Sequence, residues 1–207
     1  MTEDGARAWI ATHFGAGGVA RMERLAALVV AEAEHQNLIA RSTIAEIWAR
    51  HIVDSAQLLP IAADADGTWL DIGSGAGFPG LVVAALTERR VTLAEPRKRR
   101  VAFLQAAAEA LGIEDRVTVF AGKVARLEMT PASVISARAV APLIDLFAGA
   151  AGCATSDTLW LLPKGQSARE EVAIAAHAWH GVFHVEQSLT SRDSLIVVAR
   201  GVAFRCK

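Results

Sequence analysis

The chain has 207 residues, which suits one domain with a small extension. Hydrophobic residues make up 53% of it, so a large core is available and global disorder is excluded. The formal net charge of −1 argues against binding of long nucleic acid by bulk electrostatics, although it allows a local basic patch.

The first part of the chain, residues 1–62, is predicted to be a helical extension of a core that spans 63–207. Apolar residues recur there at helical spacing in two stretches. The second stretch follows Ser42, which we expect to be its N-cap, and Pro60 and Asp64–Gly67 mark its end. The apolar residues are Met22, Leu25, Ala26, Val29 and Ala33 in the first stretch, and Ile44, Ile47, Ile52, Leu58 and Leu59 in the second.

From residue 68 onward, strand-like and helix-like patterns alternate, which predicts an α/β fold with a mostly parallel sheet covered on both faces. Only residues 190–193 separate the last two strands. They must pair as an antiparallel hairpin, because a parallel crossover needs roughly a dozen residues or more. A parallel sheet closed by an antiparallel last strand resembles the class I fold of methyltransferases that use S-adenosylmethionine (SAM), with its Rossmann-like sheet. The predicted strands are 68–72, 91–95, 117–121, 133–137, 158–162, 182–188 and 194–200, and the predicted helices are 79–87, 97–111, 142–150 and 167–178.

A glycine-rich loop from Asp71 to Gly80 lies between the first predicted strand and the helix after it. Closely spaced glycines let the backbone approach a ligand, so the loop predicts a nucleotide-type cofactor. Gly75, Gly77 and Gly80 match the dinucleotide pattern G-x-G-x-x-G. The alternative pattern runs from Asp71 through Gly73, Gly75 and Gly77. Its glycines suit a backbone that curls under the methionine part of SAM. Asp71 stands where methyltransferases that resemble this chain carry an acidic residue, and the resemblance implies that it helps to position the amino-acid end of the cofactor.

Glu95 ends the second predicted strand, twenty residues beyond Gly75. A carboxylate at this place accepts hydrogen bonds from both ribose hydroxyls of NAD or SAM and repels the 2′-phosphate of NADP. Asp71 and the terminal hairpin favour SAM as the cofactor. An NAD-dependent oxidoreductase is the alternative, and a glycine-rich turn without a ligand is the least favoured interpretation.

Six sequence blocks together resemble the RsmG/GidB family of 16S rRNA guanine-N7 methyltransferases. They occur in the order of that family, across about residues 37–166, and the blocks around His51 and Lys164 are more specific than the glycine loop. The resemblance implies methylation of N7 of one guanine in the 530 loop of 16S rRNA, and we expect a 30S ribosomal particle rather than bare RNA as the substrate. The blocks are Asn37–Leu38, Arg50–Ser55, Asp71–Gly80, Lys98–Leu104, Ala137–Leu143 and Pro163–Gln166.

The resemblance also implies particular cofactor contacts, and the chain departs from the family at two positions near them. The family usually carries an acidic residue where this chain has Ala125, and often Asp where it has Ser133. A backbone contact to the cofactor would survive the first change, whereas a side-chain contact would not. The implied contacts are Gly73, Phe78, the backbone of Val124 and Ala125, and Arg138.

Guanine N7 carries a free lone pair at neutral pH, so its methylation requires no general base and can rest on alignment and desolvation. His51 and Asp54 lie three residues apart on one predicted helix, and therefore on one face. Their alternative role is a helix surface on which Arg50 pairs with Asp54. With the resemblance, we assign His51, Asp54 and Lys164 to the reaction site, where they order the cofactor or the base. Arg138 follows a strand at the edge where α/β folds bind ligands.

Six cations lie between residues 89 and 100, as Arg89–Arg90 and Arg97–Arg100. The second group opens a predicted helix, where cations oppose the helix dipole, so a role other than helix stability is indicated. Our hypothesis is that both groups contact RNA phosphates, and the alternative is a solvated surface. The predicted RNA-binding residues are Arg97, Lys98, Arg99 and Arg100. A small-molecule or protein acceptor is the remaining alternative to RNA.

The two cysteines, Cys153 and Cys206, are far apart and lack metal-ligand spacing. We therefore expect reduced thiols in a cytoplasmic protein and no metal site. No apolar run approaches the roughly 18 residues that a membrane span requires, and the chain begins with acidic rather than basic residues. We expect no association with membranes, and a monomer is favoured.

Overall fold

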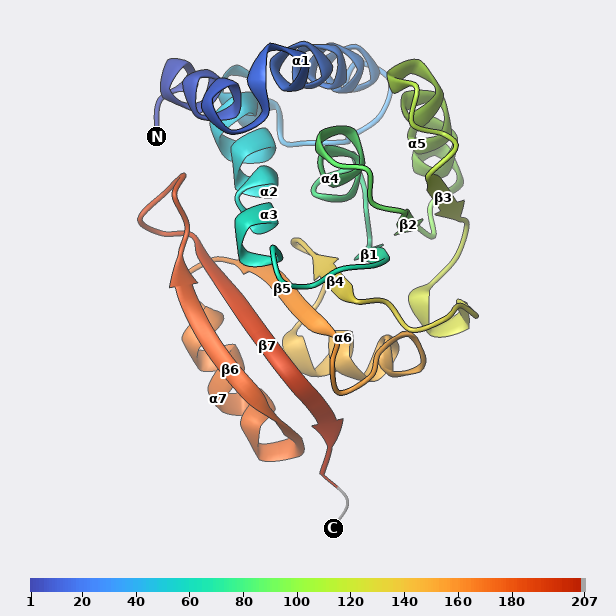
Figure 1. Ribbon diagram of the computed structural model, residues 1–207, viewed down its shortest axis with the longest axis vertical. Helices are drawn as coiled ribbons and strands as arrows, with labels where there is room; N and C mark the ends of the chain where they lie inside the picture. The colour runs from blue at the N-terminus through green and yellow to red at the C-terminus, as the bar shows by residue number, and fades with distance from the viewer. Residues whose placement is uncertain (206–207) are drawn as a thin grey trace.

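The computed structural model describes residues 1–205, and its centre is a seven-stranded sheet of order β3-β2-β1-β4-β5-β7-β6 (Figure 1). Strands β3, β2, β1, β4 and β5 are parallel neighbours, whereas β7 is antiparallel to both β5 and β6. This topology confirms the predicted, mostly parallel sheet with an antiparallel hairpin at its end. The strands are β1 (Trp69–Ile72), β2 (Val91–Ala94), β3 (Val117–Phe120), β4 (Val134–Ala137), β5 (Leu159–Lys164), β6 (Trp179–Gln187) and β7 (Leu195–Phe204).

Helices cover both faces of the sheet, because successive strand residues point to opposite sides. Val134 and Leu159 belong to one hydrophobic cluster, whereas their neighbours Ile135 and Trp160 belong to another. The first cluster includes α4 and α5, and the second includes α6 and α7, so the sheet separates two halves of the core. The helices are α4 (Gly80–Leu86), α5 (Lys98–Leu111), α6 (Leu143–Gly149) and α7 (Ala168–Ala178).

The N-terminal region forms a further layer over α4 and α5 (Figure 1). Helix α1 (Glu3–Glu32) is bent at Gly15, where φ is 67° and ψ is −174°, and the bend lets Arg7 form an ion pair of 3.0 Å with Glu23. Buried residues of α1 belong to the same hydrophobic cluster as α4 and α5. The first 62 residues and the sheet therefore share one core.

The second apolar stretch forms four short helical segments rather than one helix. Ser42 is not its N-cap: Ala40 takes that position, and the hydroxyl of Thr43 donates to the carbonyl of Ala40 at 2.7 Å. The predicted end of the stretch is confirmed, because the last segment ends at Ile61, one residue after Pro60. The segments are η1 (Arg41–Glu46, 3₁₀), η2 (Trp48–Val53, π-helical), α2 (Asp54–Ala56) and α3 (Leu58–Ile61).

Cys153 is buried, and burial raises the pKa of its thiol, whereas Cys206 lies outside the described residues. Within residues 1–205, no helix combines the length and the apolar character that crossing a bilayer requires. In the same part of the chain, no three His, Cys, Asp or Glu side chains are grouped as metal ligands.

Candidate functional site

The glycine loop after β1 contains three glycines with left-handed backbones. The φ angle is 65° at Gly73, 57° at Gly75 and 87° at Gly77, a region that residues with a Cβ enter only at a cost. At Gly73, an added Cβ would also lie 2.6 Å from a methyl group of Val140. Both the backbone conformation and the close approach therefore require glycine at this position.

Two buried carboxylates hold the loop in place. Glu95 is 2% exposed and accepts hydrogen bonds from the N–H of Gly75 at 3.0 Å and from the N–H two residues after itself at 2.9 Å. Asp71 is fully buried and accepts from the hydroxyl of Ser136 at 2.8 Å and from the N–H of Gly80 at 3.2 Å. Burial raises the pKa of Asp71 to about 6, although these hydrogen bonds act in the opposite direction.

A cavity of about 330 Å³, which we name the glycine-loop cavity, lies against the backbone of this loop. Its opposite wall comes from the segment between α1 and η1. Arg100 fixes that segment, because its Nη2 donates to the carbonyl of Asn37 at 2.9 Å. The cavity is lined by Leu38, Ile39, His51, Gly73–Ala76, Phe78, Arg100, Arg138 and Ala139.

A second cavity of about 590 Å³, which we name the strand-end cavity, shares His51, Arg138 and Ala139 with the first. It lies where β4 and β5 end and where the turn between β6 and β7 approaches η2. Ligands of α/β folds bind at this edge of the sheet. The cavity is lined by Thr43, Arg50, His51, Asp54, Arg138–Pro142, Pro163–Gly165, Glu171, Thr190 and Ser194.

Arg138 and His51 form the wall between the two cavities. Nη2 of Arg138 lies 2.9 Å from Nδ1 of His51 and is the donor, because a guanidinium has no acceptor atom. The imidazole proton therefore lies on Nε2, which donates to the hydroxyl oxygen of Thr43 at 2.8 Å. Burial, and then the charges of Arg138 and Arg50, lower the pKa of His51 to about 3. The neutral ring stacks on Phe78, with 5.1 Å between ring centroids.

Asp54 connects Arg138 to the turn of the terminal hairpin. Its Oδ2 lies 3.5 Å from Nη1 of Arg138, and its Oδ1 accepts from the hydroxyls of Ser188 at 3.3 Å and Thr190 at 3.2 Å. The alternative pair of Arg50 with Asp54 is not formed, because Asp54 turns toward Arg138. The contacts with Ser188 and Thr190 join residues more than 130 positions apart, which no local sequence pattern could indicate.

Lys164, at the end of β5, holds the loop that follows β4. Its Nζ donates to the carbonyl of Ala141 at 2.7 Å and to Oε2 of Glu171 at 2.8 Å, and Glu171 also accepts from the N–H of Leu143 at 3.1 Å. Burial would raise the pKa of Glu171, but the hydrogen bond and charge of Lys164 lower it below its ordinary value. The loop thus held contains Ala139, whose φ is 55°.

The predicted cofactor residues divide into two groups. Gly73, Gly75, Phe78 and Arg138 line the glycine-loop cavity. The others do not line it, and their contact with a cofactor remains a prediction: Asp71, Gly77 and Glu95, which support the loop, and Val124 and Ala125, which lie in a 3₁₀ turn after β3.

The predicted RNA-binding run also divides. Arg97–Arg99 are exposed at the start of α5, whereas Arg100 lines the glycine-loop cavity, 4.0 Å from a carboxylate oxygen of Glu95. Arg89 and Arg90 do not lie beside this run, because they precede β2 and the run follows it, at the opposite edge of the sheet, so their contact with RNA phosphates remains a separate prediction. Arg89 instead donates to backbone carbonyls of the segment before β1.

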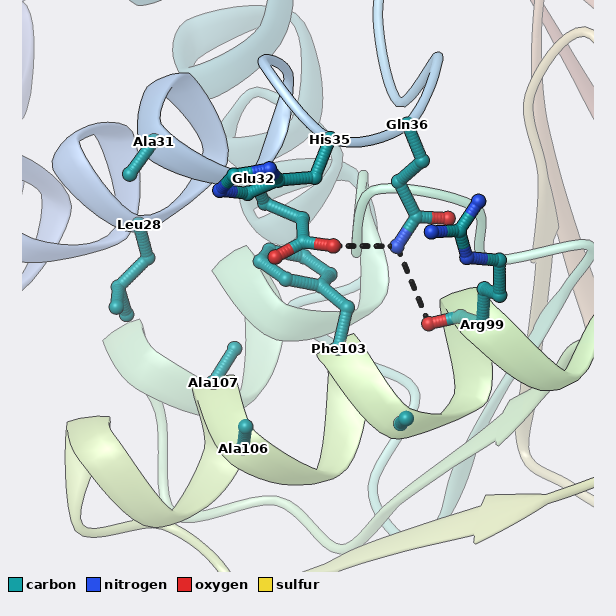
Figure 2. A pocket seen from close by; sticks show the side chains of 10 residues that line it. Leu28, Ala31, Glu32, His35, Gln36, Arg99, Phe103, Ala106 and Ala107 are labelled. Atoms are coloured by element: carbon teal, nitrogen blue, oxygen red, sulfur yellow. Dashed lines mark hydrogen bonds between the residues drawn. The ribbon is translucent and has the colours of Figure 1, made fainter.

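A third hollow, of about 500 Å³, lies between the end of α1 and α5 (Figure 2). Leu28 of α1 and Phe103 of α5 face it. Nε2 of Gln36 donates across it to Oε1 of Glu32 at 2.7 Å and to the carbonyl of Arg99 at 3.2 Å. Its lining includes no residue of the other two cavities. The side chain of Arg99 therefore borders a separate surface from that of Arg100.

Known proteins match the chain over nearly its full length. The profile of a family described as rRNA small subunit methyltransferase G matches residues 19–194. Proteins named ribosomal RNA small subunit methyltransferase G from Rhizorhabdus wittichii and Novosphingobium aromaticivorans are 49% and 47% identical, over 100% and 98% of this chain and 96% and 90% of their own.

Solved structures with low sequence identity share the fold. An O-methyltransferase from Bacillus cereus in complex with SAH has a TM-score of 0.60 at 14% identity, over 86% of this chain and 90% of its own. The glycopeptide N-methyltransferase MtfA complexed with SAM has a TM-score of 0.59 at 13% identity, over 72% and 93%. These likenesses confirm the predicted class I methyltransferase fold.

Proposed function

The chain belongs to the rRNA small subunit methyltransferase G family, and we propose that it transfers a methyl group from SAM to N7 of a guanine in the 530 loop of 16S rRNA. One observation carries the proposal: two cavities of ligand size meet at a shared wall of His51 and Arg138. A cofactor in one cavity and an acceptor base in the other would be brought together at that wall. Membership of a methyltransferase family removes the reason for the oxidoreductase alternative.

We assign SAM to the glycine-loop cavity. The left-handed glycines Gly73 and Gly75 make a cradle that a Cβ would fill or strain, and Phe78 and Arg138 complete the wall. When bound there, SAM supplies an electrophilic methyl group on its sulfonium. Each oxygen of Glu95 accepts one backbone N–H and keeps a further acceptor site, so hydrogen bonds to ribose hydroxyls remain available to it.

The residues of the shared wall align the reactants and do not take up a proton. His51 is neutral with both ring nitrogens in hydrogen bonds, and Asp54 and Lys164 are each engaged by protein partners. N7 of guanine needs no deprotonation, so alignment and exclusion of water can supply roughly 7–11 kcal/mol of the barrier reduction. We therefore propose positioning roles for all three residues.

We propose further that residues 1–62 form part of the reaction site together with the core at 63–207, because they supply Leu38, His51 and Asp54. The exposed Arg97–Arg99 remain our candidates for phosphate contacts outside the cavities. The favoured substrate is a 30S particle, which a monomer would recognise partly by shape.

The test is methylation with radiolabelled SAM of naked 16S rRNA and of 30S particles, followed by mapping of N7-methylguanine. We expect one modified guanine in the 530 loop and faster transfer to the particle. Equal rates would refute the preference for the particle, and label on a small molecule or protein alone would support the alternative acceptor. Calorimetry should detect binding of SAM and not of NADH.

A further inference from the structure

The strand-end cavity contains a cation that the cavity's own acids do not neutralise. Three cations, Arg50, Arg138 and Lys164, line it together with two carboxylates, Asp54 and Glu171. Lys164 lies 2.8 Å from Glu171 and Arg138 lies 3.5 Å from Asp54. Within residues 1–205, the exposed side chain of Arg50 has neither an ion pair nor a hydrogen bond, so the surplus positive charge is located there.

Arg50 is also held beside a second guanidinium. The backbone carbonyl of Arg50 accepts a hydrogen bond from Nη1 of Arg138 at 3.0 Å. Burial lowers the pKa of both His51 and Arg138, and the positive charge of Arg50 lowers both pKa values further. Arg50 and His51 of η2 and Asp54 at the start of α2 line one cavity. Neighbouring cations repel each other, so an anion that binds at Arg50 would relieve an unfavourable arrangement.

We propose that Arg50 binds a phosphate of the nucleotide that carries the target base and so positions this base in the strand-end cavity. A guanidinium matches phosphate as a two-pronged donor, and its hydrogen bonds to charged oxygens are strong. The base would occupy the part of the cavity next to His51 and Arg138, while the phosphate stays at the exposed Arg50. The inference rests on the proposed function, because a nucleotide acceptor is its premise.

The first test compares Arg50→Gln with Arg41→Gln, a matched control on the neighbouring segment η1 that lines none of the three cavities. We expect Arg50→Gln to raise the KM for rRNA about tenfold, as for loss of one charged hydrogen-bonded contact. The slope of log binding constant against log salt should fall by about 1, as for one phosphate contact. The KM for SAM and the Arg41→Gln variant should be unchanged.

Arg50→Lys refines this test. It keeps the charge and loses the planar fork, so the salt slope should return while the KM stays above that of the wild type. An unchanged KM and slope in Arg50→Gln would overturn the inference. Equal effects of Arg41→Gln and Arg50→Gln would overturn it too, because they would indicate a general effect of charge.

A second test separates this inference from the proposed function. The probes are guanosine and its 5′- and 3′-monophosphates, and their binding is measured by equilibrium dialysis without any RNA. We expect the wild type to bind at least one nucleotide more tightly than guanosine, and Arg50→Gln to lose this preference. If rRNA is not methylated but the preference is present, the proposed function fails and the phosphate site stands. Equal binding of all three by the wild type overturns the site.

Discussion

Replacement of Asp54 by Asn should remove the carboxylate that forms an ion pair with Arg138 in the wall between the two cavities. Oδ2 of Asp54 and Nη1 of Arg138 are 3.5 Å apart, and the two side chains are 12% and 19% exposed. At an effective dielectric constant of about 20, opposite charges at this distance attract by roughly 5 kcal/mol. Partial exposure and the like charge of Arg50 reduce this attraction, so we expect a coupling free energy of about 3 kcal/mol.

A double-mutant cycle measures this coupling. The Asp54→Asn variant keeps a side-chain oxygen as the acceptor for the hairpin hydroxyls, so the substitution mainly removes the charge and sets an amide donor against a guanidinium donor. Urea unfolding of the wild type, Asp54→Asn, Arg138→Gln and the double variant gives the four free energies of unfolding. The exposed pair of Arg7 and Glu23, which are 45% and 56% exposed, serves as the control and should couple by less than about 1 kcal/mol.

The outcome that would refute the reasoning is additivity. If the two substitutions at the wall add to within about 0.5 kcal/mol, the charges of Asp54 and Arg138 do not stabilise each other. A coupling as small as that of Arg7 and Glu23 would have the same meaning, since it would show that solvent screens the wall as it screens the surface.

Three further predictions follow from other parts of the site. The pKa of Asp71 is raised from 3.8 to about 6, so the folded state favours the protonated carboxyl. As the pH rises from about 4 to 6, the wild type should therefore lose up to ~3 kcal/mol of unfolding free energy relative to Asp71→Asn. A difference between the two proteins that stays constant over this range in urea unfolding would contradict the raised pKa. Because the pKa of His51 is about 3, kcat should be flat across neutral pH, and a titration near the ordinary imidazole value would contradict a neutral His51. Gly73→Ala should weaken SAM binding about tenfold or more by calorimetry, whereas Gly112→Ala, with a φ of 66° and open space around it, should leave SAM binding unchanged.

Much of the fold could be predicted because its signals are local. Alternating strands and helices, broken at glycines and polar turns, gave bounds for α4 to α7 within one residue of those observed. The short turn at 190–193 required the hairpin of β6 and β7. Its length was underestimated, because Trp179 pairs with Phe204 well beyond the apolar stretches that mark the strands.

The segment from Arg41 to Ile61 could not be predicted in the same way. Apolar spacing of three and four residues fits an α-helix, and it does not distinguish this from the 3₁₀ and π-helical turns that the chain adopts. The error matters for the site, because these turns decide which side chain pairs with Asp54. An α-helical pattern suggested Arg50, whereas tertiary contact selects Arg138.

The site itself was predictable where the backbone defines it and not where long-range contacts do. The glycine loop was recognisable from its glycines, and three of its predicted residues line the cavity. Arg100 looked like its three exposed neighbours in sequence, yet the packing of α5 against the segment before η1 turns it into the cavity. Glu171 had no signal at all, because its role depends on where Lys164 points.

The N-terminal region explains how a strand-end arginine becomes a fixed wall. A guanidinium at the end of β4 would otherwise be solvated and mobile, but within residues 1–205 the three groups that accept hydrogen bonds from Arg138 all belong to residues 50–54. Those residues are positioned in turn by α1, because the carboxylate of Glu3 accepts from the N–H groups of Trp48 at 3.1 Å and Ala49 at 2.9 Å at the start of η2. Charge-assisted bonds of this kind fix a helix start firmly. A sheet common to many methyltransferases thus acquires its particular wall from the layer that α1 adds.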